Sequence, residues 1–244
     1  MNRRILRSLL FFLSIAQPKM KYYAIIVAGG KGNRMNQDIP KQFIELDGKP
    51  VLMHTIQSFY NCVLNPEIIL VLNSEQHRFW KELCHTHSFS IPHQVIEGGK
   101  ERFDSVKNGL AVVKGDGVVA VHDAVRPLAS TALIMASYQM ALAQGNAIAA
   151  IQPVDSVRIK KEGQHSLSLN RDELFLIQTP QTFVTEQLRR AYLQPYSDAF
   201  TDDASVVEKA GFSINILPGE RSNIKITYVQ DLELASFLLK KQGS

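Results

Sequence analysis

From residue 21 onward, short apolar runs alternate with longer stretches in which apolar residues recur at helical spacing. The short runs predict β-strands and the longer stretches predict amphipathic helices. Strands and helices that alternate in this way form the α/β class, a mostly parallel sheet with helices on both faces. The predicted strands are Tyr23–Ala28, Glu67–Leu72, Gln94–Glu97, Val118–His122, Ala147–Gln152 and Ser213–Leu217. The predicted helices are Pro50–Asn61, Ser74–His85, Ser105–Val113, Ser130–Gln144, Thr185–Tyr192, Ala204–Ala210 and Val229–Lys241.

One stretch interrupts this alternation. Ser156–Lys160 and Ser166–Leu169 flank the polar segment 161–165, which predicts a β-hairpin that projects from the domain as an arm. A two-stranded hairpin is only marginally stable alone, so we expect the arm to pack on another surface, such as a second subunit. Residues 20–244 contain no internal repeat and no low-complexity linker, which favours one domain.

Residues 1–19 differ in character from the rest of the chain. Their apolar run Leu9–Ala16 resembles the core of a signal peptide but is shorter than the roughly 20 apolar residues that span a bilayer. Met20 directly precedes the first predicted strand, so we interpret residues 1–19 as a non-structural leader or a misassigned start. A targeting or anchoring segment and an ordered helix are the alternatives. This segment has no acidic residue, and its basic residues are Arg3, Arg4, Arg7 and Lys19.

The net charge of +4 comes from 27 basic and 23 acidic residues and raises the possibility of a nucleic-acid partner. The leader accounts for all of this excess, because residues 20–244 contain equal numbers of basic and acidic side chains. These residues also lack a basic cluster interleaved with aromatics, so we expect no nucleic-acid binding.

Composition narrows the class further. An apolar fraction of 45% and a charged fraction of 20% exclude a disordered chain and a multi-span membrane protein, and we expect no membrane association. The two cysteines, Cys62 and Cys84, exclude a disulfide scaffold and fit a reducing compartment. We therefore expect the protein in the cytoplasm.

A glycine-rich segment directly follows the first predicted strand. Glycines let backbone N–H groups approach a phosphate closely, although the spacing is neither that of a Walker A loop nor that of a dinucleotide fingerprint. A tight turn without a ligand is the alternative. The nearby Arg34 and Lys41 favour a site for a nucleoside triphosphate. The segment reads Ala28-Gly29-Gly30-Lys31-Gly32-Asn33-Arg34-Met35.

A second glycine pair, Gly98-Gly99, joins a predicted strand to the helix predicted from Ser105. One interpretation is a turn in which Ser105 caps that helix. In the functional interpretation, backbone groups and Ser105 bind a nucleotide base, and Arg102 supports the loop.

Asp123 follows the strand Val118–His122. Ligand sites in parallel sheets lie at the carboxyl ends of the strands, so Asp123 is suited to hold Mg²⁺ against phosphate oxygens. Arg126, next to Pro127, is suited to grip a phosphate in bidentate fashion. The alternative is that Asp123 only caps a helix.

Weaker candidates follow along the chain. Thr201 either contacts a ligand or caps the helix predicted at Ala204, and Lys225 is either a ligand contact or an exposed strand lysine. The segments concerned are Asn170-Arg171, Gln178–Gln181, Thr201–Asp203 and Asn223–Lys225.

Taken in order, these motifs resemble the 2-C-methyl-D-erythritol 4-phosphate cytidylyltransferase family over residues 22–240. The resemblance implies a Rossmann-like fold and a homodimer whose arms, about residues 155–178, exchange between subunits. It also implies transfer of the cytidylyl group of CTP to a sugar-alcohol phosphate, with Mg²⁺ as the cofactor. The motifs that carry it are Ala28–Met35, Pro40-Lys41-Gln42, Gly98–Val106, His122–Pro127, Gln178–Gln181, Thr201–Ser205 and Asn223-Ile224-Lys225.

The resemblance further implies roles for individual residues. Those with a catalytic role are Arg34, Lys41, Arg171 and Lys225. Those that bind the nucleotide are Ala28, Gly29, Gly30, Gly32, Gly99, Arg102, Ser105, Asp123 and Ala124, with Asp123 as the ligand of Mg²⁺. Those that bind the methylerythritol phosphate, some from the partner subunit, are Arg126, Ser156, Arg171, Thr179, Thr201 and Lys225.

Two other functions remain as alternatives. Ribitol-5-phosphate cytidylyltransferases share the glycine loop, Lys41 and the segment His122–Pro127, but Arg102 with Ser105 and the segment Thr201–Ser205 favour the methylerythritol enzyme. A non-catalytic nucleotide-binding protein on the same fold is the alternative from another class. It is disfavoured because the chain has Arg34, Lys41 and Asp123.

Overall fold

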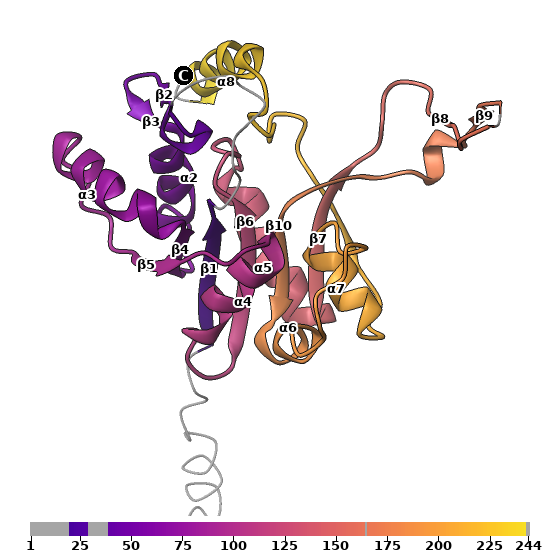
Figure 1. Cartoon of the computed structure of the whole chain (residues 1–244), viewed down its shortest axis with the longest axis horizontal. Helices are drawn as coiled ribbons and strands as arrows, with labels where there is room; N and C mark the ends of the chain where they lie inside the picture. Colours follow the sequence, from indigo (N-terminus) through magenta and orange to yellow (C-terminus); the bar gives the residue numbers. More distant parts are fainter. Residues whose placement is uncertain (1–19, 29–38, 164, 243–244) are drawn as a thin grey trace, which may run out of the picture.

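The computed structural model describes residues 20–28, 39–163 and 165–242. Its centre is a seven-stranded sheet with the order β11-β7-β10-β6-β1-β4-β5 (Figure 1). Strands β4, β1 and β6 pair in parallel, as do β4 with β5 and β7 with β11, whereas β10 is antiparallel to both of its neighbours. The strands are β1 (Lys21–Val27), β4 (Glu67–Leu72), β5 (Gln94–Glu97), β6 (Gly117–Asp123), β7 (Asn146–Ile151), β10 (Leu176–Val184) and β11 (Ile216–Pro218).

The two faces of the sheet are covered by different helices, as the sequence predicted. Ala24 and Ile26 of β1 belong to the cluster that includes buried side chains of α2, α3 and α5, and Tyr23 and Ile25 belong to the cluster on the other face with α4, α6 and α7. Successive side chains of β1 therefore alternate between two apolar layers, which explains why the strand is an almost continuous apolar run. The helices are α2 (Val51–Tyr60), α3 (His77–Thr86), α4 (Arg102–Ala111), α5 (Thr131–Gln144), α6 (Thr185–Ala191), α7 (Asp203–Lys209) and α8 (Val229–Gln242).

The predicted mostly parallel α/β sheet is confirmed, with one strand that the sequence pattern missed. Strand β10 contains buried polar residues and Pro180, and its register shifts between Ile177 and Gln181. Its buried polar side chains are paired with neighbouring segments, as Gln181 is with the start of α7. Because this strand is not a plain apolar run, its hydrophobicity did not indicate a central strand.

Two predicted helices begin differently in the structure. Helix α4 starts at Arg102 rather than Ser105, with a capping box between Glu101 and Asp104. Ser105 therefore lies inside the helix, and the interpretation that it caps α4 is wrong. The segment predicted as one helix from Ser74 is divided into a 3₁₀ turn, η2 (Ser74–Gln76), and α3.

The arm leaves the sheet after β7 and returns at β10, and Figure 1 shows that it projects away from the domain. Its strands β8 (Arg158–Ile159) and β9 (Leu167–Ser168) pair in antiparallel fashion, and they are shorter than predicted. The 3₁₀ turn η3 (Arg171–Glu173) follows them. Several apolar side chains of the arm are exposed, including Val154, Ile159 and Leu167.

A small layer lies near the carboxyl ends of the parallel strands. It contains the 3₁₀ turn η1 (Lys41–Phe43), the hairpin of β2 (Glu45–Leu46) and β3 (Lys49–Pro50), and α8 (Figure 1). Leu46, Ile226 and Ala235 pack together in its own apolar cluster. The leader, residues 1–19, lies outside the described residues, so the division of the chain at residue 20 stays a prediction. In the part of the chain that the structure describes, no helix is long and apolar enough to cross a membrane.

Candidate active site

A carboxylate surrounded by three cations lies at the carboxyl end of β6. The Asp123 Oδ2 atom is 2.9 Å from Nζ of Lys225 and 3.5 Å from Nε of Arg126. The other oxygen, Oδ1, is 3.8 Å from Nη2 of Arg102. Arg102 is also paired with Asp203, so the three cations face two carboxylates, and the cluster keeps a net positive charge. Such a charge suits an anionic ligand.

The charges around Asp123 decide its ionisation. Burial alone would raise the pKa of this carboxyl, but the nearby Arg102, Lys225 and Arg126 outweigh burial and hold its pKa well below the usual range. Asp123 is therefore ionised throughout the physiological pH range, and its carboxylate can bind a cation.

Thr179 and Asn223 hold the elements of the cluster in place. The backbone N–H of Asp123 donates to Oγ1 of Thr179 at 3.0 Å, and this bond ties β6 to β10. Nη1 of Arg126 donates to the carbonyl of Asn223 at 2.7 Å, two residues before Lys225. Asn223 in turn donates to the carbonyl of Thr179 at 2.8 Å. The coil that carries Lys225 is thus fixed to the end of β6 through β10, and Lys225 is not a strand residue.

The loop between β5 and α4 lies at the same edge of the sheet. The Gly99 N–H donates to Oγ of Ser105, and that hydroxyl donates to the carbonyl of Glu101. A Cβ atom at Gly99 would lie only 2.2 Å from the Cβ of Asp104, so the tight packing of the loop requires glycine there. The loop is therefore closed on itself, with Gly99 exposed and Ser105 buried.

The residues that end β1 connect this edge to Lys41. Ala28 donates its N–H to Val71 of β4 and accepts at its carbonyl from Nε2 of Gln42, the residue after Lys41. The N–H of Ala124 donates to the carbonyl of Val27, which joins the ends of β1 and β6. Turn η1, with the partly buried Lys41, is thus anchored beside the ends of these two strands.

Comparison with known proteins identifies the family. The family model of 2-C-methyl-D-erythritol 4-phosphate cytidylyltransferase matches residues 22–241. The chain belongs to this family. A cytidylyltransferase of that name from Phocaeicola vulgatus is 48% identical over 221 residues, which is 90% of this chain and 100% of the relative. The one from Bacteroides thetaiotaomicron is 48% identical over 223 residues, with 90% and 100% of the two chains covered.

Solved structures of cytidylyltransferases of this family share the fold. The crystal structure of 4-diphosphocytidyl-2C-methyl-D-erythritol synthase from Anaerococcus prevotii is 28% identical, with a TM-score of 0.78, and covers 91% of this chain and 97% of its own. The Francisella tularensis 2-C-methyl-D-erythritol 4-phosphate cytidylyltransferase is 32% identical, with a TM-score of 0.74 and coverages of 89% and 99%. The Rossmann-like fold implied by the sequence motifs is confirmed.

The residues that the cytidylyltransferase resemblance implicates do not all lie in one place. Asp123, Ala124, Arg126, Thr179, Lys225 and Arg102 lie together around the end of β6. Ala28 follows the neighbouring strand β1, Gly99 lies in the loop after β5, and Ser105 lies in α4. Ser156 and Arg171 lie on the projecting arm, and within one chain they are not part of this cluster (Figure 1). Gly29, Gly30, Gly32 and Arg34 fall outside the described residues.

Thr201 and the arm arginine have well-defined local partners. Thr201 is exposed just before α7, and its backbone N–H donates to Oγ of Ser205. The cap of α7 is Asp202, so Thr201 does not cap it. Nη1 of Arg171 donates to the carbonyl of Val154, which leaves the guanidinium on the exposed surface of the arm.

Several buried polar residues belong to the site although the sequence motifs assigned them no role. Gln178, Asn223 and Asp203 have at most 5% exposed surface, and each is hydrogen-bonded to a segment that carries a site residue. The signal in the sequence was their position inside the motifs Gln178–Gln181, Thr201–Ser205 and Asn223–Lys225. Which partner each one holds depends on contacts between distant segments.

His122 supports the turn of the chain that carries Arg126. Its Nε2 lies 3.0 Å from the carbonyl of Arg126, and the ring is fully buried. Burial lowers the pKa of His122 to about 4. The neutral tautomer with its proton on Nε2 is therefore the form that supports this turn.

The lowered pKa of His122 predicts a loss of stability in mild acid. His122 binds a proton near pH 6.5 in the unfolded chain but only near pH 4 in the folded chain. The free energy of unfolding therefore falls as the pH drops from about 6.5 to 4. We expect about 2 kcal/mol less free energy of unfolding at pH 5 than at pH 7.5 from this group, measured by urea unfolding. In the His122→Gln variant this part of the pH dependence disappears, whereas His85→Gln, at an exposed position, should retain it. Equal pH dependence in both variants would contradict the assignment.

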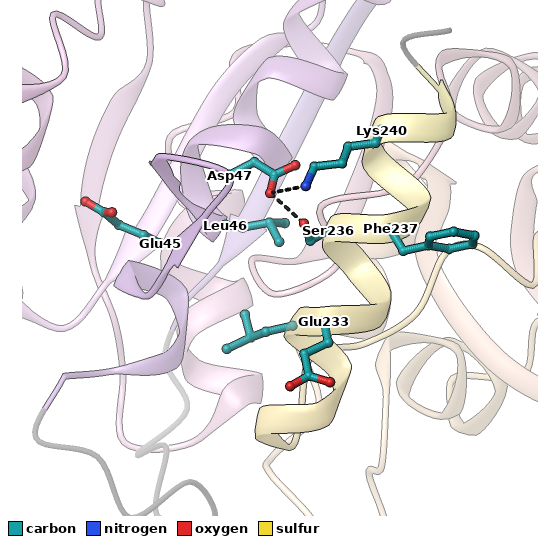
Figure 2. A pocket seen from close by; sticks show the side chains of 8 residues that line it. Glu45, Leu46, Asp47, Glu233, Ser236, Phe237 and Lys240 are labelled. Atoms are coloured by element: carbon teal, nitrogen blue, oxygen red, sulfur yellow. Dashed lines mark hydrogen bonds and ion pairs between the residues drawn. The ribbon is translucent and has the colours of Figure 1, made fainter.

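A surface groove lies apart from this cluster. Figure 2 shows it between the β2–β3 hairpin and α8, where Asp47 contacts Ser236 and Lys240. It measures about 540 Å³, and its other lining residues include Glu233 and Phe237. None of its lining residues is among the predicted site residues. The candidate active site is therefore the cluster at the end of β6, and not this groove.

Proposed function

We propose that the cluster around Asp123 carries out the reaction named for the family, transfer of the cytidylyl group of CTP to 2-C-methyl-D-erythritol 4-phosphate. In this reaction a phosphate oxygen of the acceptor forms a bond to the α-phosphorus of CTP, and the bond from that phosphorus to the bridging oxygen breaks. Pyrophosphate leaves with the electron pair. The observation that carries the proposal is one carboxylate with three cations at the carboxyl edge of the sheet.

The charge balance of the site fits this chemistry. Attack of one phosphate anion on another is opposed by electrostatic repulsion, and the acceptor phosphate needs no general base at neutral pH. Positioning and neutralisation of charge are the expected sources of acceleration. We assign that role to Lys225 and Arg126 near the acceptor phosphate and to Lys41 and Arg34 near the triphosphate. Arg34 is carried over from the family motif alone.

Asp123 is suited to hold a divalent cation that arrives with the nucleotide. Mg²⁺ is usually bound by one or two carboxylates, with phosphate oxygens and water as its other ligands. Asp123 is ionised, and its Oδ1 has no cation closer than Arg102 among the described residues. When bound, Mg²⁺ would neutralise charge on the phosphates. The chain's own part is to present Asp123 beside the loop that holds the base, formed by Gly99 and Ser105.

The experiment that tests the function is release of pyrophosphate from CTP with each of two acceptors. We expect rapid release with 2-C-methyl-D-erythritol 4-phosphate and little with ribitol 5-phosphate, since the family match and the relatives favour the first. Preference for ribitol 5-phosphate would support the alternative enzyme. No release with either acceptor, while CTP still binds, would support a nucleotide-binding protein without catalysis.

A homodimer through the arm would complete the site. Arg171 and Ser156 match acceptor-binding positions of the family but lie on an arm that projects from its own domain (Figure 1). Exposed apolar side chains on that arm, Ile159 and Leu167, are suited to an interface with a second copy. Unlinked cysteines are consistent with assembly in the reducing cytoplasm.

We predict that Leu167→Lys separates the dimer, because a charge would be buried where the arms pack. The expected result is a halved mass in sedimentation, with activity reduced at least about tenfold at low protein concentration. The matched control is Leu193→Lys, an 81% exposed leucine outside the arm, which should change neither. An active monomer of Leu167→Lys would contradict a role of the partner's arm in the site.

A further inference from the structure

A buried ion pair joins two motifs that lie far apart in the chain. Nη1 and Nη2 of Arg102, the first residue of α4, donate to Oδ1 and Oδ2 of Asp203 at 2.8 and 2.7 Å. Asp203 is the first residue of α7 and has no exposed surface. The hydroxyl of Tyr192 donates to the same Oδ1 at 2.6 Å. Both oxygens of Asp203 are therefore engaged, in the bidentate geometry that restricts a guanidinium most strongly.

The same guanidinium faces the carboxylate of the active site. Nη2 of Arg102 lies 3.8 Å from Oδ1 of Asp123, beyond hydrogen-bond distance. Two carboxylates thus compete for Arg102, and the geometry favours Asp203. Asp123 receives the field of Arg102 without a direct hydrogen bond from it.

Asp203 is itself held by contacts that do not involve Arg102. Nε2 of Gln181 in β10 donates to Asp202, the cap of α7, and Oε1 of Gln181 accepts from the N–H of Ala204. The ring of Tyr192 stacks on Phe103, the residue after Arg102, with a centroid distance of 4.7 Å. The start of α7 is therefore a fixed anchor against which Arg102 is oriented.

We infer that Asp203 is a positioning residue. By pairing with Arg102, it prevents the guanidinium from hydrogen-bonding to Asp123, so that Oδ1 of Asp123 stays available to the divalent cation bound to the nucleotide. The inference rests on the proposed function of Asp123. Burial of an ion pair adds little net stability compared with a well-packed apolar pair, so stability alone does not account for this arrangement. The pair also connects the loop of Gly99 with the helix that follows Thr201, the two sides of the proposed site.

Loss of the Asp203 charge should redirect Arg102. In Asp203→Asn the guanidinium keeps a partly buried charge without its bidentate partner, and among the described residues Asp123 is the other carboxylate within 4 Å of it. We expect Arg102 to turn to Oδ1 of Asp123 and to compete with the divalent cation. The dissociation constant of Mg·CTP should rise about ten- to a hundredfold, the size typical of changes among the residues that surround a metal ligand.

The test is isothermal titration calorimetry with Mg·CTP, and with CTP in the presence of a chelator, on four proteins. These are the wild type, Asp203→Asn, Arg102→Gln and the double variant. If Asp203 acts through Arg102, Asp203→Asn weakens Mg·CTP binding in the wild type and has no further effect in the Arg102→Gln background. A purely structural role of Asp203 would weaken binding equally in both backgrounds, and that result overturns the inference.

Two further variants keep the test informative. Asp116→Asn is the matched control, because it removes one carboxylate charge at a 99% exposed position, at the opposite end of β6 from Asp123, so its binding should match the wild type. If Asp203→Asn does not fold by circular dichroism, Arg102→Lys replaces it, because lysine cannot make the bidentate grip. Binding by Arg102→Lys at the wild-type level would then overturn the inference. Wild-type turnover is measured separately, so a wild type that binds Mg·CTP but releases no pyrophosphate counts against the proposed function alone.

Discussion

Replacing Lys225 with methionine is expected to lower kcat/KM about 10²- to 10³-fold, the loss typical of removing one preorganised group that stabilises charge in a transition state. Nζ of Lys225 lies 2.9 Å from Oδ2 of Asp123, and its side chain is 49% exposed, so the ammonium pairs with the carboxylate while the side chain stays accessible to a ligand. Methionine keeps an unbranched stem nearly as long as that of lysine and removes the ammonium, with its charge and its hydrogen-bond donors. Steady-state pyrophosphate release over a range of both substrates measures the effect.

The control is Lys240→Met on α8, where the ammonium lies 3.8 Å from Asp47 in the groove of Figure 2. This variant removes the same charge from the protein without touching the Asp123 cluster, and its kcat/KM should stay within about twofold of the wild type. Equal losses in the two variants would mean that Lys225 acts only through the overall charge.

The second large effect is expected for Asp123→Asn. Turnover should fall at least about a hundredfold, because the variant loses the carboxylate proposed for Mg²⁺ and leaves Arg102, Arg126 and Lys225 facing one another. The same variant should lose about 3 kcal/mol of unfolding free energy at pH 7, since removal of one partner leaves buried charges uncompensated. Pyrophosphate release and urea unfolding measure the two effects on the same preparation.

The pH dependence gives Asp123→Asn a distinctive signature. The folded pKa of Asp123 is lowered, so its stabilising effect is complete above the normal carboxyl range and is lost as the pH falls through and below that range. The difference in stability between wild type and variant should therefore narrow as the pH is lowered from 7 toward 3. The control is Asp116→Asn, at a 99% exposed aspartate, which should match the wild type in both activity and stability. If the difference in unfolding free energy between wild type and variant did not change with pH, the stabilisation would not come from the ionised carboxylate of Asp123.

Helix and strand positions followed closely from the chain's pattern wherever apolar residues dominate. Strands β4 and β5 occupy the predicted residues, because the continuous apolar run of β4 has no other stable environment than a parallel sheet buried on both faces. Strand β10 was missed for the opposite reason. Gln178 and Gln181 carry polar groups into the interior, and only their partners at Glu220, Asp202 and Ala204 make that position stable.

The residues of the candidate site also divide into those that the sequence could identify and those that it could not. Asp123, Arg126 and Gly99 could be selected from the sequence, because an acid at the end of an apolar strand and a glycine beside a helix start have direct chemical meaning. The role of Asp203 could not be selected, because an aspartate at the first position of a helix is ordinary. Its bidentate grip on Arg102 depends on α4 and α7 packing on the same face of the sheet.

The sequence by itself determined the α/β class, the order of most elements, the family and the residue types available for a phosphate-transfer site. These depend on local periodicity and on short motifs, whose chemistry is carried by the residues within them. The tertiary structure alone decided which charges meet. The antiparallel insertion of β10 brings Asn223 and Lys225 to Asp123, and the ion pair between the starts of α4 and α7 holds Arg102 beside the same carboxylate. Such contacts join segments about a hundred residues apart, and they form only because burial of the shared apolar core brings those segments together.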